Sequence, residues 1–176
     1  MTKPDMWEYT GSKRPPFAAT PGSGQESVWD YPRPPRLAAD KRRIVVRFGD
    51  RVIADTVDAY RVLETASPPT FYIPPKDVRA QWLHAFPGTS ICEWKGTAKY
   101  WSLRVTPPLP QAIGWSYPTA QAPYAPISGY FSFYPGRVEC FVGDERVRPQ
   151  LGFFYGGWVT SEIVGPWKGE PGTERW

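Results

Sequence analysis

The stretch "IVVRFGDRVIADT", residues 44–56, decides the fold class. Ile44, Val46 and Phe48 alternate with less apolar neighbours, which is the period of a strand that buries one face. The dipeptide "GD" at residues 49–50 separates this run from the second one, "RVIADT". Two such runs joined by a short turn predict an antiparallel hairpin.

The amino-acid composition disfavours long helices. The chain has 22 prolines and 16 glycines in 176 residues, and proline removes a backbone donor and clashes with the preceding helical turn. Aromatic residues make up 16% of the chain, which suits sheet faces and ligand-binding surfaces. Further strands are expected in "AYRVLET", "TFYIP", "TAKYWSLRV" and "QAIGWSY", and two more in "GYFSFYPGRVECFVGDERV", turning at "PG".

One segment, "PPKDVRAQWLHAF", predicts a short helix. Pro75 suits a first helical turn, and Asp77 complements the helix dipole there. Val78, Trp82 and Leu83 then recur on one face. We therefore predict a mainly β domain with one short helix.

The chain divides into three parts. Residues 1–41 are rich in proline, glycine and basic side chains and predict an extended arm, partly docked through Trp29 and Tyr31. Residues 42–148 form the core domain, and residues 149–176 form an aromatic wrap that covers the sheets with Phe153, Phe154, Trp158 and Trp167.

The net charge and the cysteine content limit the possible binding partners and the cellular compartment. A net charge of +4 permits acidic partners but does not demand them. The two cysteines, Cys92 and Cys140, are too few for a disulfide framework, and no run resembles a signal region or a membrane span. These features predict a cytoplasmic protein without a membrane partner, as a monomer or a small homo-oligomer.

Common catalytic and metal motifs are missing. Two distant cysteines and one histidine do not make a zinc site, so we expect no metal and no cofactor. For His84, on the predicted helix, we favour a packing role over a catalytic one. Neither "GxxxxGK[ST]" nor "GxGxxG" occurs, so no phosphate loop is predicted.

The segment "CEWKG", residues 92–96, leads into the strand "TAKYWSLRV" and carries the most reactive groups. A lysine near a thiol favours the thiolate, which is the nucleophilic form, so Lys95 would activate Cys92. The alternative is that Cys92 is a small buried apolar residue and Lys95 an ordinary surface lysine. In the strand itself, Tyr100 and Trp101 point to opposite faces.

Five segments together resemble bacterial proteins of the domain of unknown function 427 family. They are "ESVWDYPRPPRL", "IADTVDAYRVLETASPPTFYIPPKDV", "CEWKGTAKYWSL", "GWSYPTAQAPYAPISGYFSFYPGRVE" and "GGWVTSEIVGPWKGEPG". The resemblance implies a β-tent (Mss4-like) fold, in which two antiparallel sheets lean together and leave a groove between them. Many proteins of that fold hold a zinc with four cysteines, which this chain lacks.

Three functions are compatible with these features. The first is a small-molecule-binding domain for a planar or anionic ligand, including nucleotide-like molecules. The second is an enzyme that uses Cys92 with Lys95, Glu64 and Tyr100 in thiol or acyl chemistry. The third is a nucleic-acid or protein interaction module that uses the basic arm. We favour the first, and the predicted ligand-binding residues are Glu64, Tyr72, Arg79, Trp94, Lys95, Tyr100, Trp101, Trp115 and Tyr117.

Overall fold

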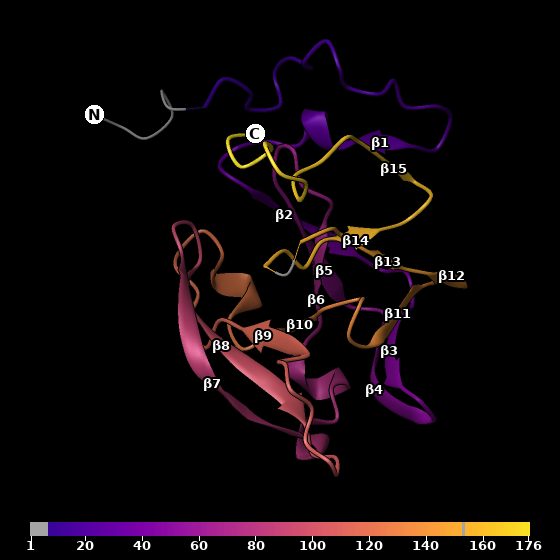
Figure 1. Ribbon diagram of the computed structural model, residues 1–176, viewed down its shortest axis with the longest axis vertical. Coiled ribbons are helices and arrows are strands. Elements are labelled where there is room, and N and C mark those ends of the chain that lie inside the picture. The colour runs from indigo at the N-terminus through magenta and orange to yellow at the C-terminus, as the bar shows by residue number, and fades with distance from the viewer. Residues whose placement is uncertain (1–6, 153) are drawn as a thin grey trace.

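The computed structural model describes residues 7–152 and 154–176 and confirms a mainly β protein with antiparallel sheets (Figure 1). Its helical segments are single 3₁₀ turns. The strands are β1 (Glu26–Ser27), β2 (Arg36–Asp40), β3 (Ile44–Phe48), β4 (Arg51–Thr56), β5 (Ala59–Leu63), β6 (Thr70–Tyr72), β7 (Leu83–Cys92), β8 (Gly96–Leu103), β9 (Gly114–Ser116), β10 (Phe131–Phe133), β11 (Glu139–Val142), β12 (Glu145–Arg146), β13 (Arg148–Pro149), β14 (Trp158–Val159) and β15 (Ile163–Val164). The 3₁₀ turns are η2 (Val28–Asp30), η3 (Pro75–Asp77), η4 (Ala80–Trp82) and η5 (Ala125–Ile127).

The predicted hairpin is confirmed as β3 and β4, which pair antiparallel with Phe48 opposite Arg51. Gly49, in the turn between them, has a φ of 55°, a conformation that glycine adopts without steric cost. This hairpin forms half of a four-stranded sheet in the order β12-β11-β3-β4. Ile44 and Val46 are fully buried, as the alternation predicts.

Two further sheets, β10-β9-β8-β7 and β2-β5-β6, hold the remaining long strands. They join where the residue after β6, Ile73, exchanges two backbone hydrogen bonds with Phe131 of β10, at 2.8 and 2.9 Å. In Figure 1 the pair β7 and β8 lies on the opposite side of the molecule from β3 and β4. Buried apolar residues of both sides, such as Leu103 and Ile44, belong to one hydrophobic cluster.

The predicted division into two sheets is too coarse. The described residues form five sheets, two of which have only two strands. The two strands predicted to turn at "PG" do form, as β10 and β11, but they belong to different sheets. Tyr134 caps the turn by accepting backbone hydrogen bonds from Arg137 and Val138, and this redirects the chain from one sheet to the other.

The predicted helix is wrong. Pro75 and Asp77 start only the 3₁₀ turn η3, because Val78 pairs with Ala54 and the backbone N–H of Arg79 donates to Ile53 at 2.8 Å. From Leu83 onward the segment is β7, which pairs with β8. The long-range sheet hydrogen bonds thus replace those of a local helix. His84 consequently lies on a strand.

The N-terminal arm is docked on the folded protein along much of its described length, since Tyr9 and Ala18 pack against the cluster around Trp29 and the N–H of Ala19 donates to the carbonyl of Gly165 at 2.9 Å. Trp29 is fully buried and its indole nitrogen donates to the carbonyl of Pro166 at 2.9 Å. Tyr31 is also buried. Within the predicted arm, Arg36–Asp40 forms β2 and pairs along its whole length with β5, so the arm contributes a strand to a sheet.

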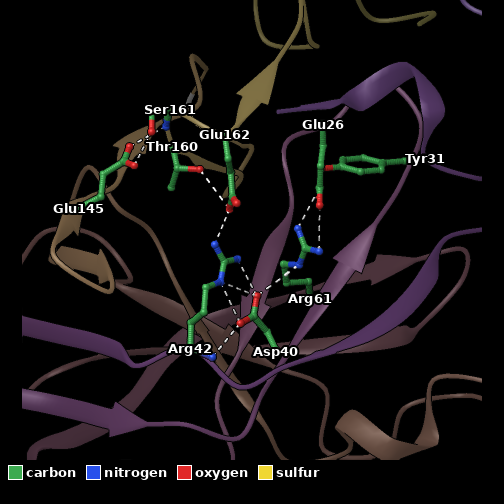
Figure 2. A network of polar contacts seen from close by, with 9 residues as sticks. All are labelled: Glu26, Tyr31, Asp40, Arg42, Arg61, Glu145, Thr160, Ser161 and Glu162. Atoms are coloured by element: carbon green, nitrogen blue, oxygen red, sulfur yellow. Dashed lines mark hydrogen bonds and ion pairs between the residues drawn. The ribbon is translucent and has the colours of Figure 1, made fainter. Parts of the chain in front are cut away.

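A network of ion pairs fixes this N-terminal region to the sheet and to the C-terminal part of the chain (Figure 2). Asp40 on β2 is paired with Arg42 at 2.6 Å and with Arg61 of β5 at 3.4 Å. Arg42 continues to Glu162 at 2.8 Å, and Arg61 to Glu26 at 3.0 Å. The network therefore joins three segments that are distant in sequence.

The C-terminal segment contributes to the core unevenly. Trp158 of β14 is fully buried and stacks on Phe71, with ring centroids 4.7 Å apart. Trp167 is half-buried against the cluster around Trp29. Phe154, by contrast, is 72% exposed, so the prediction that it covers a sheet is wrong, while the prediction for Phe153 falls outside the described residues.

The strand β7 forms one edge of its sheet. Its pairing with β8 is interrupted between Phe86 and Thr89, so that Pro87 and Gly88 have no partner in the ladder. Gly88 has a φ of 98°, and Pro87 lacks an N–H donor. The outward edge is therefore broken in the middle.

A search of the described residues for a membrane-spanning helix finds none that is sufficiently long and apolar.

Candidate functional site

A partly open cavity of about 240 Å³ lies against the face of β8 and β9 and is here called the aromatic cavity. The turn after β5, the end of β7, Gln150 and residues 154–157 complete its walls. Its aromatic lining includes Tyr72, Trp115 and Tyr117, which are all buried. The cavity is therefore built by several regions of the chain that are far apart in sequence.

Strand alternation explains which side chains reach the cavity. Ala98 and Tyr100 of β8 share one face, and Trp115 of β9 pairs directly with Tyr100. On the other side of β8, Ser90 pairs with Ala98, and its hydroxyl lies 2.7 Å from that of Tyr100. Polar and aromatic groups thus form one continuous wall.

Lys95 is the buried cation of this site. It lies in the turn between β7 and β8, and its residue is only 7% exposed. The turn is closed by Gly96, at a φ of 102°, and by the N–H of Gln121, which donates to the Lys95 carbonyl at 3.0 Å. The ammonium nitrogen of Lys95 lies 5.5 Å from the ring centroid of Tyr117, within cation–π range.

The surroundings of Lys95 favour its charged form. Burial by itself lowers the pKa of Lys95, but the neighbouring Tyr72, Cys92 and Glu64 outweigh that effect and raise it. Burial also raises the pKa values of Tyr72 and Tyr117, so both phenols keep their protons at neutral pH. The cavity therefore presents an ammonium group and neutral phenols.

Glu64 also lines the aromatic cavity, just after the end of β5. A carboxylate oxygen of Glu64 lies 3.6 Å from Nε of Arg33, whose side chain is only 2% exposed. Arg33 also donates to the carbonyl of Thr65 at 2.9 Å. The carboxylate of Glu64 thus already has a cationic partner outside the cavity.

The two cysteines have different environments. Cys92 lines the aromatic cavity and is half-buried, and its thiol is a hydrogen-bond neighbour of Lys95 and Tyr117. Cys140 lies on β11 and is fully buried, and this burial raises the pKa of its thiol well above the usual range. Cys92 is therefore the thiol that a cavity ligand could reach.

Three predicted ligand-binding residues lie outside the cavity lining. Trp101 faces the opposite side of β8, where it packs on Phe131 with ring centroids 5.5 Å apart. Arg79 is exposed and its guanidinium lies 5.3 Å from the ring centroid of Trp82. Trp94 packs beside the aromatic cluster without lining the cavity, because the β7–β8 turn directs Lys95 inward instead. The structure brings together Glu64, Tyr72, Cys92, Lys95, Tyr100, Trp115 and Tyr117.

Several lining residues were not predicted, among them Tyr134, Gln150 and Gly156. Tyr134 packs on Trp115 with ring centroids 4.7 Å apart, and burial raises its pKa to about 12. Gln150 holds the segment in place by accepting a hydrogen bond from the N–H of Gly157 at 3.1 Å. The dipeptide "GG", residues 156–157, could have indicated a close contact in the sequence. Gly156 lies against the ring of Trp115, and a Cβ at this position would overlap that ring.

Metal binding finds no support at this site. Among residues 7–152 and 154–176, no three His, Cys, Asp or Glu side chains gather closely enough to hold an ion. The expectation that the protein works without zinc stays a prediction.

These features define a mainly β protein whose sheets enclose an aromatic cavity with a buried lysine. The chain belongs to the domain of unknown function 427 family, because residues 36–144 match the family described as "Domain of unknown function (DUF427)". The match begins at the first residue of β2. No curated protein matches the chain.

Proposed function

We propose that the protein binds a small, planar, anionic molecule in the aromatic cavity. The observation that carries this proposal is the buried ammonium group of Lys95, which forms no ion pair with any carboxylate of the described residues. A buried charge is costly unless it is paired. An anionic ligand would supply the missing partner.

The walls indicate the shape of the ligand. Trp115, Tyr72 and Tyr134 present flat surfaces, against which a planar group stacks favourably. A cavity of about 240 Å³ lies below the usual range of roughly 300–1,000 Å³ for ligand pockets. The ligand would therefore be about the size of one aromatic ring with its substituents.

Tryptophan fluorescence tests this proposal, since Trp115 is part of the wall. The titrants are aromatic acids, nucleobases and nucleotides, each compared with a neutral analogue. Lys95→Met should weaken the binding of anions about tenfold or more, because a buried ion pair is lost. The matched control is Lys99→Met, an exposed lysine of β8, which should leave binding unchanged. Equal binding of anions by wild type and Lys95→Met would refute the proposal.

A second candidate is an enzyme that uses Cys92 as a nucleophile. Its support is that Cys92 lines the same cavity beside Lys95 and Tyr117. The rate of iodoacetamide labelling of Cys92 is measured against pH. If the labelling rate depends on pH as it does for a free thiol, Cys92 is not activated and the enzyme mechanism loses its nucleophile.

The interaction module has less support. Several basic side chains near the N-terminal region are paired, among them Arg14 with Asp30 at 2.6 Å and Arg43 with Asp55 at 2.7 Å. A basic side chain that is already paired with a carboxylate attracts a phosphate group less strongly. Binding of single-stranded nucleic acid that weakens steeply with salt would restore this alternative.

A further inference from the structure

The aromatic cavity is lined by two charged side chains of opposite sign among the described residues, Lys95 and Glu64. They differ in their partners. Glu64 is paired with Arg33 at 3.6 Å, whereas Lys95 has no carboxylate partner within the described chain. Glu64 lies near enough to Lys95 to favour its charged form but forms no ion pair with it, so the ammonium group of Lys95 has no direct contact with an anion among the described residues.

The position of Arg33 keeps its charge away from a ligand. Its side chain is only 2% exposed and does not line the cavity. Its Nη2 atom donates to the carbonyl oxygens of Thr65 at 2.9 Å and Trp176 at 3.3 Å. The guanidinium group therefore supports Glu64 from behind and cannot form the bidentate contact by which arginine commonly binds phosphate.

We infer that Glu64 selects the charge of the ligand, so that the cavity accepts a carboxylate that carries an aromatic ring and a single negative charge, and rejects dianions such as phosphate monoesters. This inference rests on the proposed function. One negative charge is matched by Lys95. A second one would face Glu64 inside a partly enclosed cavity, where like charges repel more strongly than in water.

The hydroxyl groups of the wall fit the same ligand. Tyr117 and Tyr134 remain protonated at neutral pH, and their hydroxyl groups are hydrogen-bonded within the wall, to Cys92 and to Tyr100. A carboxylate has two oxygens that accept such bonds beside an ammonium group. Lys95 thus matches one negative charge, and the neutral phenols add no charge of their own.

The test measures the affinities of three ligands that share a phenyl ring: 3-phenylpropanoate, phenyl phosphate and phenylalanine. Wild-type protein at neutral pH should bind 3-phenylpropanoate at least about tenfold more tightly than phenyl phosphate, which corresponds to about 1.4 kcal/mol. Equal or tighter binding of phenyl phosphate would overturn the inference and leave the proposed function intact. Tighter binding of phenylalanine would also overturn it, since Glu64 would then attract a cation.

Changing the pH tests the same point without a mutation. Phosphate monoesters lose their second proton near about pH 6, so phenyl phosphate is a monoanion at about pH 5 and a dianion at about pH 8. Its affinity should fall across this range by more than that of 3-phenylpropanoate. Parallel curves for the two ligands would contradict charge selection.

A variant gives the third readout. Glu64→Gln should raise the affinity for phenyl phosphate about tenfold relative to 3-phenylpropanoate, while Glu139→Gln, on the distant strand β11, should not. Thermal unfolding of Glu64→Gln, compared with that of Glu139→Gln, reports whether the protein stays folded when Arg33 loses its partner. An unchanged ratio in folded Glu64→Gln would overturn the inference. Absence of binding by every anion would instead refute the proposed function itself.

Discussion

The indole nitrogen of Trp115 donates a hydrogen bond of 3.1 Å to the hydroxyl oxygen of Tyr72, and the two rings lie at 87° to each other. Trp115 is on β9 and Tyr72 on β6, so this bond joins two sheets at the wall of the aromatic cavity. Because both side chains are buried, their positions are set by packing. The cavity is accordingly formed before any ligand enters, as is usual for ligand sites.

Gly156→Ala should disturb the cavity from the side of the C-terminal segment. A Cβ at this position would overlap the ring of Trp115. Overpacking of this kind typically costs about 1–3 kcal/mol. Chemical denaturation should show this loss, and the tryptophan emission of the folded protein should shift.

The matched control is Gly22→Ala, whose new Cβ would meet only the flexible end of Gln25 at 3.2 Å. It should change neither the free energy of unfolding nor the emission spectrum appreciably. If both variants behave alike, the close contact between Gly156 and Trp115 has no energetic importance.

Trp29→Ala should destabilise the whole protein, although this residue belongs to a segment that resembles a tail in sequence. The side chain is fully buried and hydrogen-bonded to Pro166. Loss of a buried tryptophan typically costs about 3–5 kcal/mol. Phe17→Ala is the control, since Phe17 packs on the same ring but is 49% exposed. Similar unfolding midpoints for the two variants would mean that the N-terminal region is only loosely attached.

Asp40→Asn should alter how stability depends on pH. Burial raises the pKa of Asp40, but hydrogen bonds from Arg42 and the charges of Arg42 and Arg61 outweigh it, so the pKa is lowered. A lowered pKa stabilises the folded state above the unfolded value of about 3.9, and this contribution is lost as the pH falls below it. The variant should therefore be less stable at pH 7 and show a flatter decline in acid.

Asp55→Asn serves as the control for this experiment, because the pair of Asp55 with Arg43 is largely exposed. An exposed pair contributes less than about 1 kcal/mol. Urea denaturation at a series of pH values measures both variants. If the free energy of unfolding of Asp40→Asn falls with decreasing pH as steeply as that of the wild type, other carboxylates cause the acid sensitivity.

The two cysteines should react with iodoacetamide at very different rates. Cys92 is half-buried at the aromatic cavity, whereas Cys140 is fully buried. Mass spectrometry should find one labelled thiol in the folded protein and two after denaturation. Rapid labelling of Cys140 in the folded protein would contradict the packing of β11.

The sequence predicted those strands that depend on nearby residues. The hairpin β3–β4 follows from local alternation and a short turn. The helix prediction failed because Pro75 and Asp77 are local signals, whereas Val78 and Leu83 are held by partners elsewhere in the chain. Local propensity does not contain those pairings.

The sequence also predicted only part of the candidate site. Of the neighbours Tyr100 and Trp101, only Tyr100 lines the cavity, and strand alternation alone should have separated the two. Tyr134 and Gly156 could not be assigned, because the path of the C-terminal half across the cavity depends on packing between distant segments.

The interruption of β7 at Pro87 and Gly88 affects the behaviour of the protein in concentrated solution. An intact outer edge would offer a row of unpaired backbone groups on which a second copy could add its own strand. Here a neighbouring chain would meet a missing donor and a kink in the middle of the strand. We therefore expect this edge of the sheet that carries the cavity to be a poor template for the strand of a second copy.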